Sequence, residues 1–418
     1  MKLWCLNAKW TERVESLARP CRSPRSMRAL LACLMFAASI AGATLARAAA
    51  PPPQPKSGPG GADYVATDVV KRAVGRASAA TYVFHAAGAA AEPRPVVVFI
   101  HAWGATNPQA YGGWINHLAR KGYLVLFPKY QEVNRTRPAD ATNIAASLVK
   151  DAFAALANDE QARPDVGKVA YVGHLAGAAV ATNLAALAKA KEIPVAKLLF
   201  ALMPGGIASD PKSRGVLLAD LSQIDASTLI VTMIGDREAS ASDRASKRII
   251  KEAENVPANR KLFVRALSDD HGFPALSATL SSPGSANTAF DAAAIKIPPD
   301  PPRDPKAPRD RGWRWSADMS LTGEQTVLAN QLNAASTDAL DYMAYWKALD
   351  LALQAAFSGK DAAALRDDPT FLDMGRWSDG WPVKRLFAET PRTEASPPPG
   401  PRKTSAPSLM PVPSKKRR

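Results

Sequence analysis

The fold of this chain is decided by the stretch Val169-Ala-Tyr-Val-Gly-His-Leu-Ala-Gly-Ala178. Its first four residues are apolar and mostly suited to strands, which predicts a buried strand. Gly173 and Gly177 then flank a tight turn, and the alanine-rich residues 176–190 predict a helix. The stretch therefore predicts a strand that turns sharply into a closely packed helix.

The spacing of the two glycines is that of the nucleophile elbow G-x-S-x-G, in which the central side chain attacks the substrate. Here the central residue is Leu175. An aliphatic side chain has no lone pair to attack with and no proton to give up, so covalent catalysis at this position is chemically impossible. We still expect Leu175 to hold the strained backbone conformation at the tip of such a turn.

Apolar runs alternate with helical segments along the central part of the chain. This alternation predicts an α/β fold, with a mostly parallel central sheet and helices on both faces. The expected strands are 95–100, 123–127, 169–172, 197–202, 228–233 and 261–265. The expected helices are 141–156, 176–190 and an amphipathic segment, 342–357, in which Tyr342, Trp346, Leu349, Leu353 and Phe357 share one face.

Two polar segments follow later strands of this series: Gly235-Asp236-Arg237-Glu238 and Asp269-Asp270-His271-Gly272. The elbow, the strand order and the order of these segments resemble the α/β-hydrolase family, specifically its secreted esterase and lipase-like members without a large lid. The resemblance covers residues 62–391.

The resemblance implies roles for particular residues. Glu238 fits the position of the catalytic acid, with Asp236 as the alternative, and His271 fits the catalytic histidine. The oxyanion hole is expected from the backbone N–H of Ala176 and from an N–H of the loop at Ala102 and Trp103. The site departs from the family pattern in three places, because Leu175 replaces the nucleophile, Ala102 stands where glycine is usual, and Glu238 stands where aspartate is usual.

The N-terminal residues 1–48 have the pattern of a secretory signal peptide, which could also begin at Met27. An uncharged run, 29–46, ends in the cleavage pattern Ala46-Arg47-Ala48. The expected location is therefore exported, periplasmic or extracellular, and a retained membrane anchor is the alternative. All three cysteines precede the expected cleavage site, so the mature chain would have no disulfide.

The remaining segments are rich in proline. Residues 49–61 are expected to be a Pro/Gly linker, and 298–311 an irregular Pro-rich insertion in the domain 62–391. The tail 392–418 holds seven Lys and Arg against one Glu, and much of the net charge of +15 lies there and in residues 1–48. We expect the tail to be disordered, with weak contact to anionic surfaces as its one potential interaction and no specific nucleic acid partner.

No cofactor or metal is expected. The five histidines lack the spacing of zinc sites, and the Gly/Ala-rich segments lack the spacing of nucleotide-binding loops. The leading hypothesis is that the protein is a catalytically inactive relative of the α/β-hydrolases that it resembles. It would bind a small apolar or ester-like ligand or act as an interaction module. The alternative is an active carboxylic-ester hydrolase that uses another nucleophile or an activated water. A third hypothesis is a cell-envelope tether built around the basic tail.

Overall fold

The structure is a computed structural model that describes residues 48–88, 90, 92–237, 240–302, 314–321 and 325–390. Several predicted features lie outside these residues: positions 1–47 of the expected signal peptide, 303–311 of the Pro-rich insertion, Glu238 and the basic tail. Among the described residues, no helix is long and apolar enough to cross a membrane.

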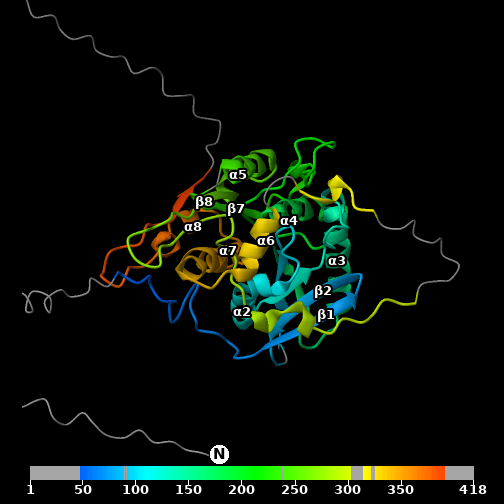
Figure 1. Ribbon diagram of the computed structural model, residues 1–418, viewed down its shortest axis with the longest axis horizontal. Coiled ribbons are helices and arrows are strands. Elements are labelled where there is room, and N and C mark those ends of the chain that lie inside the picture. Colours follow the sequence, from blue (N-terminus) through cyan, green and yellow to red (C-terminus); the bar gives the residue numbers. More distant parts are fainter. Residues whose placement is uncertain are drawn as a thin grey trace, which may run out of the picture. The chain divides into compact units, whose positions relative to one another are not determined.

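The centre of the described chain is a sheet of nine strands in the order β1-β2-β4-β3-β5-β6-β7-β8-β9. Figure 1 shows β1 and β2 at one end of this sheet and β7 and β8 toward the other end. The six strands from β4 to β8 run parallel, whereas β1, β2 and β9 add antiparallel edges. The strand bounds are β1 Val69–Arg76, β2 Ala79–Ala86, β3 Arg94–Ile100, β4 Leu124–Pro128, β5 Pro164–His174, β6 Leu198–Leu202, β7 Leu229–Ile234, β8 Lys261–Arg265 and β9 Phe387–Glu389.

Helices cover both faces of this sheet. The α-helices are α2 Gly112–Arg120, α3 Ala141–Leu156, α4 Ala176–Leu187, α5 Ser240–Glu252, α6 Gln325–Ala334, α7 Trp346–Phe357, α8 Ala363–Arg366 and α9 Pro369–Leu372. Short 3-10 helices are η1 Pro108–Tyr111, η2 Pro138–Asp140, η3 Leu221–Gln223, η4 Ala258–Arg260, η5 Thr288–Phe290, η6 Ala292–Ala294 and η7 Ala317–Met319, and one π-helical turn, η8, spans Asp341–Tyr345.

Successive side chains of a strand point to opposite faces of the sheet, so the contacts of β3 show which helices lie on each face. Val96, Val98 and Ile100 of β3 belong to the core cluster that includes residues of α3, α4 and α5. Phe99 points to the other face and packs edge-on against Trp114 of α2, at 5.5 Å between ring centroids. Because successive strand residues face opposite sides, β3 is buried on both faces, as a central parallel strand must be.

The sequence pattern predicted the α/β class and the six parallel strands, and the structure confirms both. The predicted helix 141–156 coincides with α3, and the aromatic stripe of 342–357 lies on η8 and α7. The antiparallel strands β1, β2 and β9 were not predicted, since their pairing depends on partners elsewhere in the sheet.

The segment expected to be a linker, 49–61, is hydrogen-bonded to the domain from Ala50 onward. The Gly60 N–H donates to Asp350 Oδ2 of α7 at 2.7 Å, and the Tyr342 hydroxyl donates to the Pro52 carbonyl at 2.7 Å. Proline and glycine in this stretch therefore shape a fitted surface segment, and the composition alone could not reveal its partners.

Candidate functional site: an elbow without a nucleophile

The turn between β5 and α4 has the geometry of a nucleophile elbow. Leu175 lies at its tip with φ 54° and ψ −119°, the positive-φ conformation that the pattern predicts. The turn is held by three backbone hydrogen bonds of Leu175: its N–H donates to the Leu202 carbonyl at 3.0 Å, and its carbonyl accepts from Ala178 at 3.0 Å and Gly205 at 3.2 Å. A non-glycine residue in such a conformation costs about 1–3 kcal/mol, which the surrounding structure must offset.

The two flanking glycines allow the helix to approach the sheet. A Cβ on Gly173 would lie 2.2 Å from the Gly177 carbonyl oxygen, and one on Gly177 would lie 2.3 Å from the carbonyl oxygens of Ile100 and His101. Real Cβ atoms do not come so close to backbone oxygen atoms. The sharp turn therefore depends on both glycines, whatever side chain stands at the tip.

The Leu175 side chain is buried, with only 3% of the residue exposed. Its Cδ2 lies 3.9 Å from the position that a Cβ on Gly205 would occupy. Leu321, which precedes α6, joins Trp103 and Ala176 in the main core cluster and lies against Gly206. The place where a substrate carbonyl would meet a nucleophile is thus lined with apolar side chains.

One expected oxyanion donor is already engaged. The Ala102 N–H donates to the Tyr111 hydroxyl at 3.1 Å, and that hydroxyl lies 2.9 Å from His174 Nδ1. His174 Nε2 lies 2.9 Å from the Leu280 carbonyl, which can only accept, so Nε2 carries the proton and Tyr111 donates to Nδ1. Burial lowers the pKa of His174 to about 4, consistent with this neutral ring. His174 therefore orients a buried chain of hydrogen bonds that engages the Ala102 N–H, one of the amides expected in the oxyanion hole.

The other two expected donors remain available. Within the described part of the chain, neither the Trp103 N–H nor the Ala176 N–H donates to a protein acceptor. Ala176 is the first residue of α4, where the helix dipole places partial positive charge. These two amides could hold a carbonyl oxygen, but the residue beside them at the nucleophile position is Leu175, which cannot attack it.

The expected acid and histidine are not joined in the structure. Asp236 accepts hydrogen bonds from the Ser268 hydroxyl at 2.5 Å and from the Ser268 N–H at 3.0 Å. His271 Nε2 instead lies 2.6 Å from Asp379 Oδ2. The expected Asp236–His271 pair is thus replaced by two separate contacts, because residues far along the chain supply a nearer carboxylate. Glu238 lies outside the described residues, so its role stays a prediction.

His271 belongs to a partly exposed aromatic cluster. Its side chain is 30% exposed and stacks on Trp381 at 5.6 Å between ring centroids and an interplanar angle of 15°. The loop is anchored by Asp269, whose carboxylate accepts from the Trp377 indole and from the Lys384 N–H. Sequence reasoning missed Asp379; its only sequence signal is the aromatic-rich stretch 377–381 in which it lies.

The other histidines occur in buried structural contacts. His117 Nε2 lies 2.9 Å from Asp350 Oδ2. The His101 ring stacks on Tyr130 at 4.3 Å between ring centroids, and its Nδ1 contacts the carbonyl of the next residue, Ala102. His85 contacts the neighbouring Ala86 carbonyl. Between described residues, no histidine is hydrogen-bonded to a serine or threonine hydroxyl, the arrangement that activates such a nucleophile. No cluster of metal-binding side chains occurs among the described residues either.

A small cleft lies beside the elbow, between the loops after β3 and β4 and the segment around α6. We call it the elbow cleft; its volume is about 260 Å³. It is lined by Trp103, Gly104, Gln131, Val133, Asn134, Met319, Ser320, Leu321, Ala329, Asn330 and Asn333. No charged side chain is among these residues. Gln131 uses its Oε1 to accept from the Gly104 N–H at 2.7 Å, and its Nε2 makes no hydrogen bond to a described residue.

One protein-family model matches part of the chain. The chlorophyllase family model matches residues 65–231, a span that contains the elbow and excludes His271 and Asp379. No curated protein sequence matches the chain.

Three solved esterase structures illustrate the similarity. Carboxyl esterase 2 of Tuber melanosporum is 14% identical, with a TM-score of 0.38 over 49% of this chain and 79% of that one. An esterase of Pyrobaculum calidifontis is 15% identical, with a TM-score of 0.37 over 49% and 77%. A bacterial heroin esterase is 14% identical, with a TM-score of 0.37 over 49% and 76%.

Proposed function

The chain is a member of the esterase and lipase-like α/β-hydrolase fold family, and from this premise we propose that it is a non-catalytic binding protein. Leu175 at the tip of an otherwise intact elbow carries the proposal. Without a nucleophile there, the first covalent step of ester hydrolysis has no attacking atom. The same conclusion is supported by the histidines of the described residues, none of which is hydrogen-bonded to a serine or threonine hydroxyl that could replace the missing nucleophile.

The elbow cleft is the proposed ligand site. Its polar lining consists of amide and hydroxyl groups, chiefly from Gln131, Asn330 and Asn333, while Trp103 and Leu321 supply apolar surface. Such a lining favours a small uncharged molecule with a hydrogen-bonding carbonyl, such as a neutral ester or amide, because a charged ligand would lose hydration without gaining an opposite charge. The volume of about 260 Å³ restricts the ligand to a small molecule or to one end of a larger one.

The catalytic part of the proposal is tested by activity. The natural protein should release no p-nitrophenol from p-nitrophenyl butyrate above the buffer rate, and a fluorophosphonate probe should not label it. Leu175→Ser should show weak or no turnover, because the His271 ring directs its Nε2 at Asp379 and stacks on Trp381, so that nitrogen is not directed at a new serine hydroxyl. Robust hydrolysis by the natural protein, abolished in His271→Ala, would overturn the proposal.

The binding part is tested with p-nitroacetanilide, an uncharged amide. Its binding should quench tryptophan fluorescence, since Trp103 lines the elbow cleft. Asn330→Leu should weaken binding, whereas Asn259→Leu, at a position that does not line the cleft, serves as the matched control. Equal affinities of the two variants would rule out this cleft as the site.

We also propose that the protein is exported. The support is the apolar run 29–46 followed by Ala46-Arg47-Ala48. Cell fractionation with N-terminal sequencing should find a mature chain outside the cytoplasm that begins at Ala49. A full-length chain in the cytoplasmic fraction would contradict this.

A further inference from the structure

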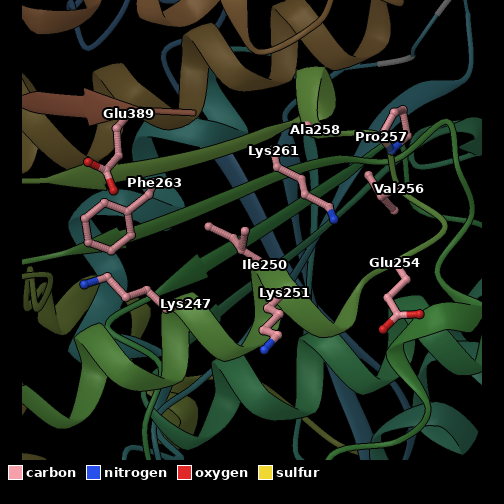
Figure 2. A pocket seen from close by; sticks show the side chains of 10 residues that line it. All are labelled: Lys247, Ile250, Lys251, Glu254, Val256, Pro257, Ala258, Lys261, Phe263 and Glu389. Atoms are coloured by element: carbon pink, nitrogen blue, oxygen red, sulfur yellow. The ribbon is translucent and has the colours of Figure 1, made fainter. Parts of the chain in front are cut away.

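A second hollow lies far along the sheet, between α5 and the strands β8 and β9 (Figure 2). We call it the α5 groove; its volume is about 650 Å³, within the range of small-molecule sites. It is lined by Lys247, Ile250, Lys251, Glu254, Val256, Pro257, Ala258, Lys261, Phe263 and Glu389. None of these residues belongs to the elbow or to the elbow cleft.

The unusual feature of the α5 groove is Lys261 at the start of β8. The residue is only 7% exposed, yet its ammonium group has no hydrogen bond and no ion pair with any described residue. Figure 2 shows its side chain pointing into the groove. Little of this residue contacts solvent and its charge is not paired directly, so an anion entering the groove would gain a direct ionic contact there.

The surrounding charges direct an anion toward this deep position. Lys251 has no ion pair within the described residues, and Lys247 is paired with Asp243 at 2.8 Å. Both glutamates of the lining, Glu254 and Glu389, are exposed, whereas Lys261 is buried. The positive charge is therefore innermost and the negative charges lie toward solvent.

The floor of the α5 groove is apolar. Ile250, Val256 and Phe263 are buried side chains that face the space between α5 and β8 (Figure 2). A purely ionic ligand such as inorganic phosphate would leave this surface unused. A ligand with an anionic head and an aliphatic body would contact both parts, since its body gains from burial against these side chains.

We propose that the α5 groove binds a small amphipathic anion, an aliphatic carboxylate whose head pairs with Lys261 and Lys251 and whose chain lies on Ile250, Val256 and Phe263. This site is independent of the elbow and needs no catalysis. Depletion of water around the pair makes the ionic contact stronger than it would be at an open surface.

The test is calorimetric titration of the full chain with decanoate below its micelle-forming concentration. Lys261→Met keeps the aliphatic stem and removes the charge, and it should weaken binding at least about tenfold, the loss expected for one charge-assisted hydrogen bond. Glu254→Gln removes an opposing charge and should strengthen binding. Lys212→Met, an exposed lysine in another loop, is the matched control and should leave the affinity unchanged. All variants keep the basic tail, so the tail cannot produce the differences.

Chemical acetylation of the natural protein gives a second readout that needs no variant. Decanoate should slow acetylation of Lys261 and Lys251 and leave that of Lys212 unaffected. The proposal is overturned if decanoate does not bind saturably, if Lys261→Met binds as well as the parent, or if decanol or inorganic phosphate binds as tightly as decanoate.

Discussion

The elbow and the His271 loop depart from a hydrolase site in opposite ways. At the elbow the backbone keeps the strained turn, with Leu175 at φ 54°, but the aliphatic side chain cannot act as a nucleophile. At the loop the side chain His271 is present, but its Nε2 is paired with Asp379 and the ring stacks on Trp381. One region has geometry without a reactive group, and the other has a reactive group without the geometry.

This difference teaches what holds each feature in place. The elbow turn is required by packing, because Gly173 and Gly177 allow contacts between α4, β3 and β5 that the fold needs with or without catalysis. The orientation of His271 depends on one side-chain contact from a distant segment. A turn that is packed in the core is retained when catalysis is lost. A partly exposed side chain such as His271 has fewer packing constraints and can form a hydrogen bond with another nearby group.

The largest expected effect tests the packing role of the elbow. Gly177→Ala would place a methyl group 2.3 Å from two backbone oxygens, and such a clash can be relieved only by moving α4 away from β3. We expect a loss of about 4 kcal/mol or more in the free energy of unfolding, measured by urea denaturation. Gly205→Ala is the matched control, since its nearest neighbour would be 3.8 Å away. Similar stability of the two variants would mean that packing does not maintain the turn.

The second prediction contrasts a buried histidine pair with the exposed one. Asp350 accepts from His117 and from the Gly60 N–H, so Asp350→Ala leaves both donors buried without a partner. We expect a loss of about 3 kcal/mol on denaturation, the cost of breaking a buried pair from one side. Asp379→Ala, at the exposed His271 pair, should melt close to the parent temperature. If both substitutions had equal effects, exposure would not explain the difference between the two pairs.

A smaller effect should measure the strain at the tip of the elbow. Leu175→Ala and Leu175→Gly both remove the buried side chain, but only glycine adopts the positive φ without strain. Relief of about 1–3 kcal/mol of strain exceeds the roughly 0.5–1 kcal/mol entropic cost of glycine, so the glycine variant should be the more stable by about 1 kcal/mol. Thermal and urea denaturation of the pair decide this. A more stable alanine variant would show that the turn is relaxed.

The smallest effect concerns the pH response of the His271 loop. The pKa of Asp379 is lowered, first by the hydrogen bond from the Trp381 N–H and then by that from His271. Because the folded pKa lies below the unfolded value, this contact stabilises the fold above the unfolded pKa and is lost as the pH falls through the folded pKa. His271→Ala should raise the pKa of Asp379 only part of the way, as read from the carboxyl ¹³C shift in an NMR titration. An unchanged titration curve would contradict the pairing.

Sequence alone determined the parts of this protein that depend on local pattern. The parallel strands follow from short apolar runs, α3 from a segment rich in alanine and leucine, and the turn at Leu175 from two glycines four residues apart. The absence of a nucleophile was also evident, because chemical identity at one position needs no structure. In each case the deciding residues are neighbours along the chain, so the interactions that fix the local structure act between residues close in sequence.

Only the tertiary structure decided the contacts between distant residues. The partner of His271 lies 108 residues away, the packed segment near Gly60 is held by Asp350, and the Ala102 amide is engaged by Tyr111. Lys261 likewise became notable only in the structure, where it is buried beside a groove without a hydrogen bond or ion pair to a described residue. Hydrogen bonds and charge pairs act over a few ångströms in space, whatever the separation along the chain, and sequence order does not specify which groups folding brings that close.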